Sequence, residues 1–433
     1  MNIPLDNLYN FIEGIANNTA VFYLFLPHGS RKISDLQMLN DYTQYQILTA
    51  PRVICHDQEP LNFDYYTDNL EQMQICKAMT NQQFFDKFGV ENWLGIKNNN
   101  LKLGTYGHAG IDIHDKTILL HSELNSIDLE TYQNNGYVGA YWWSHAIISR
   151  DWYRYAQADP NLYMPRSPTK TFLIYSRGFT KEREYRLKFL ELLVNSNLDQ
   201  HSIVSMLHNE DGQSVKQYIP HDSALFVSDP LIFNQIPECQ VSSSASAGYN
   251  FKDIISTYLA VVLETQFNGS KLHLTEKTLR PIACGQPFIL AAAPGALALL
   301  RHYGFQTYEN LIDESYDFEA NSVRRLEKII HAMKKLQSQS NKQWQDWWHH
   351  AQQIALHNQR YFFSHDFYQI VVNQLRSNLT VALQEVGHTK GKLWRSNRNY
   401  LRNTKCANWK TALTLDNEKI KLKELLRLRK IRS

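Results

Sequence analysis

The stretch that decides the fold runs Leu274-Thr-Glu-Lys-Thr-Leu-Arg-Pro-Ile-Ala-Cys-Gly-Gln-Pro-Phe-Ile-Leu290. Thr275 is a good N-cap residue, because its hydroxyl can accept a hydrogen bond from the first turn of a helix. Gly285 suits the position just past a helix end, and Pro287 prevents that helix from continuing. The stretch therefore predicts a short helix followed by a new element.

Apolar runs on both sides of this helix predict buried strands, at residues 259–263 and 287–290. A second helix is predicted from Pro294, because proline is favoured at the first helical position. Strand, helix, strand and helix joined by short loops are typical of an α/β fold with a parallel sheet.

Polar residues fall where ligands usually bind in such sheets, at the carboxyl ends of the strands. Glu264 follows the first strand, and Glu276 and Lys277 begin the helix. The free N–H groups of a helix start favour an anion, and a lysine adds a mobile charge suited to phosphate. An acid and a solvated lysine are equally ordinary in a first turn, so both interpretations stay open.

Glu264, the Thr-Glu-Lys at 275–277 and the Gly-x-Pro-Phe-Ile that follows resemble the donor-binding segment of fucosyltransferase-like glycosyltransferases. The run 304–317 is similar to its continuation in bacterial and phage-type enzymes. The resemblance covers about residues 258–318. It implies a GT-B arrangement of two facing Rossmann-like domains and a nucleotide-sugar donor. This helix continues Thr-Leu-Arg where those enzymes usually have Leu-Trp, so the resemblance does not identify the sugar.

An arginine upstream of that segment often contacts the donor phosphates in the enzymes that the chain resembles. Arg177 matches it in position, in a Ser-Arg-Gly turn that also suits phosphate, and Lys181 follows nearby. A surface arginine on a turn is the alternative for Arg177. The expected donor-binding residues are Arg177, Lys181, Glu264, Thr275, Glu276, Lys277 and Thr278.

The chain is long enough for two domains. Three prolines at 158–168 predict a linker. We expect an N-terminal Rossmann-like domain on the acceptor side at 1–165, a nucleotide-sugar domain with packing helices at 166–375, and a helical, basic tail at 376–433.

Further elements follow from apolar runs and helical periodicity. Trp344, Trp347 and Trp348 have the spacing of a packing stripe on one helix face. The strands are predicted at 20–26, 51–55, 117–121, 138–141, 170–175 and 202–207. The helices are predicted from a cap at Asp6 to residue 16, from a cap at Thr180 over 183–193, and at 321–336, 341–362 and 366–386.

The sharpest catalytic candidates, His56, Asp57 and Glu59, follow the strand at 51–55. A carboxylate at a strand end is partly desolvated, which raises its pKa and suits a general base. We favour Asp57 as the base, with His56 as an orienting neighbour, facing Lys277 across a cleft. An aspartate that only caps a turn is the alternative. Three segments, Asp57-Gln-Glu-Pro60, His121-Ser-Glu123 and Trp143-Ser-His145, also resemble segments of uncharacterised phage and bacterial glycosyltransferase-like proteins.

A metal is not expected. The chain has no Asp-x-Asp triplet of the metal-dependent type. His28, His121 and His145 could together hold a metal, but three widely spaced histidines are more often structural. We therefore predict no cofactor beyond the nucleotide-sugar co-substrate.

The charge is unevenly distributed. Residues 389–433 carry 14 Lys and Arg against 3 Asp and Glu, a net charge of +11, whereas the rest of the chain carries −8. A basic arm predicts a polyanionic partner such as DNA or an anionic membrane. The alternative is a solvated amphipathic helix at 420–431.

The remaining composition predicts a cytoplasmic protein. No apolar run reaches membrane-spanning length, the first residues lack the features of a signal peptide, and the five cysteines show no disulfide or zinc spacing. For a phage protein, the compartment would be the host cytoplasm. The main hypothesis is a glycosyltransferase acting on a glycan or other acceptor. The alternatives are a phage enzyme that glycosylates modified DNA bases and a non-catalytic nucleic-acid-binding or virion-associated protein on a transferase scaffold.

Overall fold

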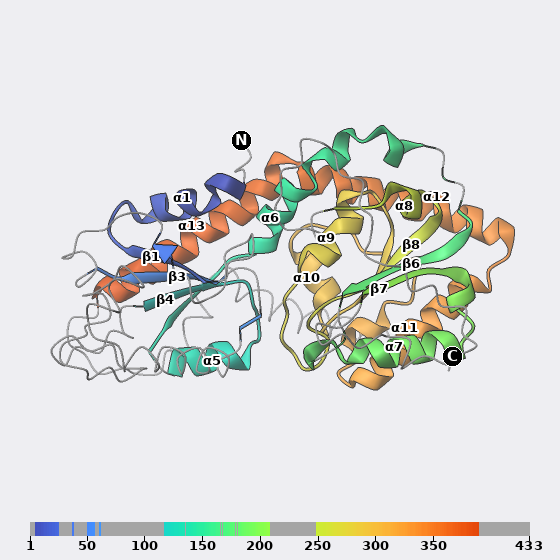
Figure 1. Ribbon diagram of the computed structural model, residues 1–433, viewed down its shortest axis with the longest axis horizontal. Helices are drawn as coiled ribbons and strands as arrows, with labels where there is room; N and C mark the ends of the chain where they lie inside the picture. The colour runs from blue at the N-terminus through green and yellow to red at the C-terminus, as the bar shows by residue number, and fades with distance from the viewer. Residues whose placement is uncertain are drawn as a thin grey trace, which may run out of the picture.

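Two sheets flanked by helices lie side by side in the computed structural model (Figure 1). The structure describes residues 5–25, 37–38, 50–56, 60–61, 117–134, 136–164, 166, 168–177, 179, 181–207 and 248–388. The predicted linker at 158–168 lies between the last strand of the first sheet and the first strand of the second. The limits of the domains stay a prediction.

The first sheet has the order β2-β1-β3-β4-β5. Its strands are β1 (Val21–Phe25), β2 (Gln37–Met38), β3 (Arg52–His56), β4 (Thr117–His121) and β5 (Val138–Tyr141). Only β2 pairs antiparallel among these strands. The four parallel strands match the predicted ones to within a residue or two, because each is a short apolar run between polar segments.

The second sheet is parallel throughout, in the order β7-β6-β8-β9. Its strands are β6 (Lys170–Arg177), β7 (Ser202–Leu207), β8 (Thr257–Leu263) and β9 (Phe288–Ala291). All of β9 and nearly all of β8 are buried, as expected for central strands covered on both faces. The α/β fold with two sheets of four parallel strands each, the first extended by the antiparallel β2, is therefore confirmed, and it is compatible with two Rossmann-like domains.

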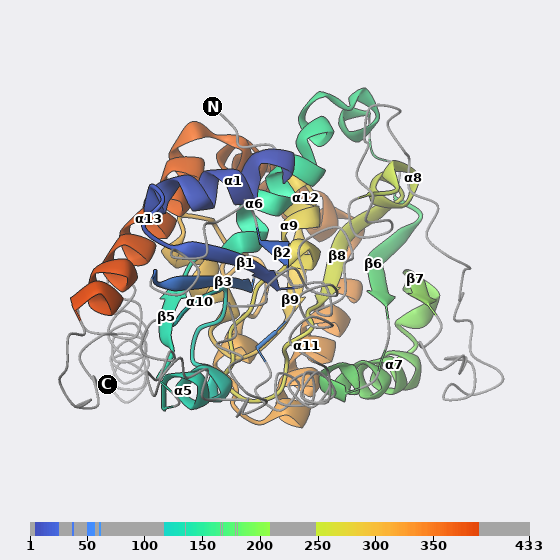
Figure 2. The same ribbon diagram turned by 60° about the vertical axis from the view of Figure 1, so that its left-hand side comes forward.

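Four helices belong to the first sheet: α1 (Leu5–Ala16), α5 (Ile127–Asn134), α6 (Ser144–Trp152) and α13 (His365–His388). The last of them, α13, follows the second sheet in sequence but packs on β4, β5 and α1 (Figure 2). The Asn378 side chain donates a hydrogen bond to the Tyr141 carbonyl at 2.7 Å. The end of the described chain thus completes the first sheet.

The remaining helices surround the second sheet. They are α7 (Tyr185–Asn195), α8 (Phe251–Ile255), α9 (Glu276–Ala283), α10 (Ala296–His302), α11 (Ser322–Gln337) and α12 (Asn341–Phe363). Short 3-10 turns occupy Arg154–Ala158, Pro160–Tyr163, Lys181–Arg183, Asp199–His201 and Ser315–Phe318. No helix in the part of the chain that the structure describes is both long and apolar enough to cross a membrane.

The predicted start of α10 is wrong. Gly295, at φ +88°, is the N-cap residue, so Pro294 lies outside the helix. The Asp317 carboxylate accepts hydrogen bonds from the Leu297 and Ala298 N–H groups, at 3.0 and 3.3 Å. A side chain distant in sequence therefore satisfies this helix start.

Two other helix starts also differ from the prediction. The first helix begins at Leu5, so Asp6 lies inside it and is not its cap. In the second sheet's unit, α7 begins at Tyr185 after a 3-10 turn, and its N-cap residue Glu184 makes no side-chain capping bond. The predicted cap, Thr180, lies outside the described residues.

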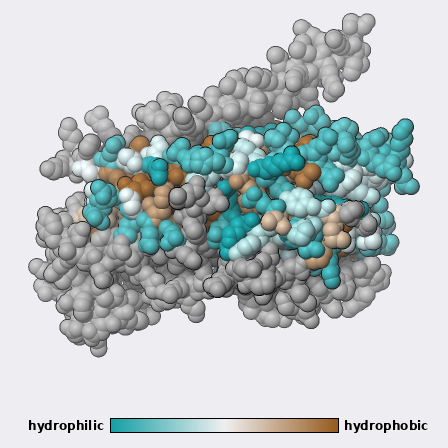
Figure 3. Space-filling model, turned by 90° about the horizontal axis from the view of Figure 1, so that it is seen from above, coloured by the Kyte–Doolittle hydropathy of each residue, from teal (hydrophilic) through white to brown (hydrophobic). Residues whose placement is uncertain are grey.

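The tryptophans of α12 pack inward, as predicted. Trp347 is buried, and Trp344 stacks on Tyr258 with ring centroids 4.6 Å apart. Trp348 meets the same tyrosine edge-on, at 5.5 Å. With these rings turned inward, the end of the molecule that bears α12 is largely hydrophilic on its outer face (Figure 3).

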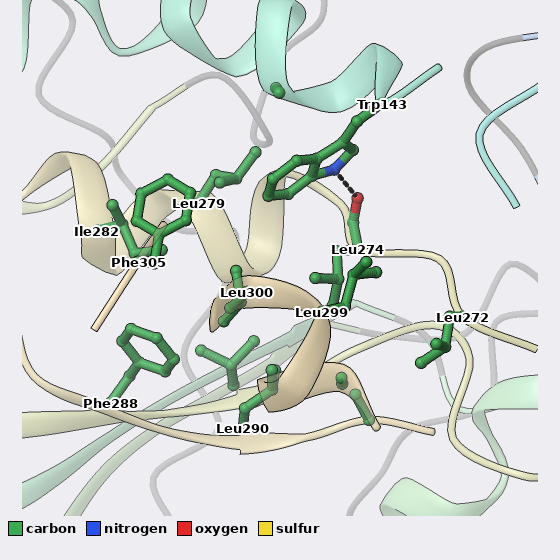
Figure 4. Close-up of a cluster of buried hydrophobic side chains, with 14 of the residues drawn as sticks. Trp143, Leu272, Leu274, Leu279, Ile282, Phe288, Leu290, Leu299, Leu300 and Phe305 are labelled. Carbon is green, nitrogen blue, oxygen red and sulfur yellow. Dashed lines mark hydrogen bonds between the residues drawn. The ribbon is translucent and has the colours of Figure 1, made fainter. Parts of the chain in front are cut away.

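The two sheets meet through segments that follow their carboxyl ends. Leu124, just after β4, forms an antiparallel bridge with Leu272, in the segment between β8 and α9. Nearby, the Trp143 indole donates a hydrogen bond to the Leu274 carbonyl at 2.9 Å (Figure 4). The carboxyl ends of the two sheets therefore face each other, where parallel α/β sheets place their ligands.

Candidate functional site

The segment 264–275 contains a lysine, Lys271, that contacts residues next to the first sheet. The Lys271 ammonium lies 2.6 Å from an Asp128 carboxylate oxygen and 2.7 Å from the Leu61 carbonyl oxygen. It also lies 3.5 Å from Glu123, which follows β4 and is only 1% exposed. This cation therefore ties the loop after β8 to acidic groups of the facing unit.

The start of α9 is held by a buried carboxylate. Glu264 is fully buried and accepts hydrogen bonds from the Thr275 N–H and hydroxyl, at 3.0 and 2.8 Å. It also accepts from the N–H and hydroxyl of Thr278, at 3.3 and 2.5 Å. Thr275 caps the helix as predicted, accepting from the Lys277 N–H at 3.3 Å.

The prediction that free N–H groups at this helix start bind a ligand anion therefore needs correction. The anion that the helix start attracts is Glu264 of the chain itself. A carboxylate in contact with backbone N–H groups makes strong charge-assisted hydrogen bonds. The cations that remain for a ligand are side chains.

The first of those cations is Lys277. Its ammonium lies 2.8 Å from Glu276 and 3.3 Å from the Thr275 hydroxyl. Glu276 is also 3.6 Å from His145, at the start of α6. Burial opposes the charge of Glu276, but Lys277 and His145 outweigh it and hold the pKa of Glu276 well below its usual range. Glu276 is thus a fixed carboxylate that positions the lysine.

Lys277 lines a cavity of about 40 Å³ between α9 and the strands β6 and β8. Arg280, one turn further along α9, lines the same cavity, as do Tyr175 and Gln286. The cavity is too small for a whole nucleotide, and most of its other lining residues are apolar. Lys277 and Arg280 therefore both contribute to the wall of one small cavity.

Arg280 was missed in the sequence, although its spacing of three residues from Lys277 places both on one helix face. Its Nε donates to the Tyr153 hydroxyl at 3.3 Å. Burial opposes its charge, but Tyr153 and Glu276 more than compensate and raise the pKa of Arg280. The guanidinium therefore stays charged.

The two remaining predicted donor-binding residues come from the end of β6, at the same edge of the sheet as the end of β8, and from the turn before α7. Arg177 is the last residue of β6 rather than part of the turn after it. Lys181 lies exposed in the 3-10 turn before α7. It makes no hydrogen bond or ion pair with the other predicted donor-binding residues among the described side chains. Hydrogen bonds do join Glu264, Thr275, Glu276, Lys277 and Thr278.

Four buried histidines gather where the sheets meet: His56 ends β3, His121 ends β4, His145 begins α6, and His273 precedes α9. Burial, with charge repulsion from His121 and His273, lowers the pKa of His56 to about 3. Burial also lowers the pKa of His121 to about 3. His56 and His121 are therefore neutral at neutral pH. Asp57 and Glu59 lie outside the described residues, so the structure does not test them as the base.

The pKa of Glu123 is raised rather than lowered. Burial raises its pKa to about 7, although Lys271 partly offsets the effect. One carboxylate oxygen accepts a hydrogen bond from the Leu61 N–H, and the other lies 3.5 Å from the Lys271 ammonium. Glu123 is a buried titratable group that was not among the predicted site residues.

No three His, Cys, Asp or Glu side chains are arranged to hold a metal ion within the described ranges. Of the three histidines considered for such a site, His28 lies outside those ranges. His121 contacts the Glu123 N–H, and His145 contacts Glu276.

Comparison with known proteins adds no function to this geometry. The chain matches no protein-family model, and no curated protein matches it. The resemblance to fucosyltransferase-like enzymes therefore stays a prediction, carried by residues 258–318.

Proposed function

We propose that the protein is a glycosyltransferase that moves a sugar from a nucleotide-sugar donor to a glycan or another acceptor. The observation that carries the proposal is the pair Lys277 and Arg280, which line one cavity on the first turns of α9. They lie near the carboxyl ends of two facing parallel sheets. In this proposal the sheets are the two halves of a GT-B enzyme.

The chemistry requires positive charge at the leaving group. Glycosyl transfer builds negative charge on the departing diphosphate, and fixed cations in an enclosed site stabilise that charge. Lys277 supplies an ammonium held in place by Glu276, and Arg280 supplies a second cation. The task of the metal in metal-dependent transferases thus falls to side chains.

The other predicted donor-binding residues take supporting roles in this proposal. Glu264, Thr275 and Thr278 hold the start of α9 and so fix the direction of Lys277. Arg177 and Lys181 are left for the outer phosphate or the nucleoside. The acceptor, a glycan or DNA, would approach from the first sheet.

Replacing Lys277 by alanine tests the proposal. The change removes a charge and no core volume, so the fold should persist while binding of a nucleoside diphosphate weakens. Hydrogen bonds to charged groups contribute about 1.5–3 kcal/mol, which corresponds to about a 10- to 150-fold loss of affinity. Calorimetric titration with UDP and GDP measures the loss.

Lys328→Ala is the matched control, because Lys328 is an exposed lysine on α11 that forms an ion pair with Glu319. It should bind like the wild type. Wild-type affinity in Lys277→Ala would remove the basis of the donor site.

DNA as the acceptor is the second candidate, favoured by the net charge of +11 on residues 389–433. Those residues lie outside the described part of the chain. Truncation before Thr389 should leave nucleotide-sugar hydrolysis unchanged and weaken binding to duplex DNA. Binding by the full chain should fall steeply with salt, since neutralised phosphates release counterions. Equal DNA binding by both forms at low salt would count against this acceptor.

Hydrolysis of a panel of nucleotide sugars, with and without duplex DNA, separates the remaining alternatives. Turnover raised by DNA selects the DNA-modifying enzyme. No nucleotide binding at all selects the non-catalytic, nucleic-acid-binding or virion-associated scaffold.

A further inference from the structure

His273 has a buried ring nitrogen with no partner. The side chain is 3% exposed and comes from the segment between β8 and α9. Its Nδ1 lies 3.2 Å from the Ser122 hydroxyl and 3.4 Å from the Ser122 carbonyl oxygen. Its Nε2 is buried and makes no hydrogen bond.

The contact with Ser122 selects the tautomer. A carbonyl oxygen only accepts, so a hydrogen bond to it places the proton on Nδ1 of His273. Nε2 is then unprotonated, and its lone pair has no hydrogen-bond donor. A buried acceptor without a donor is unfavourable, and such groups in native proteins usually have a functional role or bind an ordered water.

The neighbours of His273 connect it to the cation of the proposed donor site. Its ring meets that of His145 edge-on, with centroids 5.2 Å apart. His145 lies 3.6 Å from Glu276, which lies 2.8 Å from Lys277. The bare nitrogen and the proposed phosphate-binding lysine thus belong to one cluster.

We propose that His273 Nε2 is the general base of the transfer reaction, and that Ser122 of the facing unit is the positioning residue that orients it. This inference rests on the proposed function. The acceptor hydroxyl oxygen attacks the anomeric carbon, and its proton passes to Nε2. The bond from that carbon to the diphosphate oxygen breaks, and its electron pair leaves with the diphosphate.

The ring is neutral before the reaction. Burial, partly offset by the charge of Glu264, lowers the pKa of His273 to about 4, which leaves Nε2 unprotonated at neutral pH but also makes it a weak base. Lys277 and Lys271 also oppose protonation in the ligand-free protein. The proton passes to His273 as negative charge grows on the diphosphate beside Lys277, so the two charges that form stabilise each other.

His273→Asn tests the inference. The asparagine amide can keep the hydrogen bond to Ser122, while the place of Nε2 becomes empty space. We expect turnover of the best nucleotide sugar in the panel to fall by about 100-fold or more, the usual contribution of a general base. Binding of UDP and GDP should change less than about threefold, because the base does not hold the donor. Added imidazole should occupy the empty space and raise the turnover of His273→Asn by at least about tenfold.

His357→Asn, at an exposed position on α12, is the matched control and should behave like the wild type. Turnover by His273→Asn within about threefold of the wild type overturns the assignment. So does a loss of turnover that imidazole does not restore, because His273 would then be structural or bind only a water. A wild-type protein that neither binds UDP or GDP nor turns over a nucleotide sugar instead overturns the proposed function itself.

In an active protein, Asp57→Asn decides between the two bases. If Asp57→Asn abolishes turnover while His273→Asn retains it, the earlier prediction of Asp57 holds and His273 is not the base.

Discussion

Replacing Glu264 by alanine should lower the free energy of unfolding by about 2–6 kcal/mol. The carboxylate is fully buried, and it accepts hydrogen bonds from two backbone N–H groups and two hydroxyls at the start of α9. Alanine leaves the N–H groups of Thr275 and Thr278 buried without an acceptor, at about 1–3 kcal/mol each. Urea denaturation followed by circular dichroism measures the change.

Two further variants make this result specific. Glu264→Gln should be intermediate, because its amide nitrogen is a donor and cannot accept from the threonine hydroxyls. Glu327→Ala, on the exposed face of α11, should change stability by less than about 0.5 kcal/mol. A Glu264→Ala protein as stable as the Glu327→Ala control would show that the carboxylate does not hold the helix.

Trp143→Ala should have an effect of similar size, about 3–5 kcal/mol, as is usual for a buried tryptophan. The ring packs against Tyr303, Phe305 and Phe367, with centroid distances of 4.5, 6.3 and 5.9 Å. Its N–H holds the Leu274 carbonyl just before α9 (Figure 4). The change opens a cavity where the two units meet, and urea denaturation again measures the loss.

Trp143→Phe separates packing from hydrogen bonding, because it keeps a ring but leaves the Leu274 carbonyl without its hydrogen-bond donor. It should cost about 1–3 kcal/mol, less than alanine. Trp344→Ala, at a partly buried ring on α12, is the matched control and should also cost less. Equal losses in Trp143→Ala and Trp344→Ala would contradict the importance of this contact between the units.

Local sequence signals predicted much of the fold. The apolar runs 117–121 and 138–141 coincide with β4 and β5, because turn-forming or polar residues bound each run. Thr275 and Gly285, the latter at φ +62°, mark the limits of α9 as expected from N-cap and helix-end chemistry. Where a residue and its immediate neighbours determine the backbone, the sequence was sufficient.

Contacts between distant residues were not predicted. The cap of α10 comes from Asp317, twenty residues later, so Pro294 was a misleading signal. The hydrogen bonds from Glu264 to the two threonines of the α9 start were not predicted either. The bare nitrogen of His273 depends on Ser122, 151 residues away. Such features arise only when tertiary packing brings the groups together.

The return of α13 to the first sheet determines when that sheet can be completed during synthesis. Strands β1, β3, β4 and β5 leave the ribosome first, but α13, which covers β4 and β5, is among the last described segments to emerge. Until then, the apolar surface that meets Leu375 and Leu379, both buried in the finished protein, lacks its cover. The N-terminal half therefore has to wait for the second unit to be made, and a fragment that ends at the linker would expose a sheet face prone to aggregation.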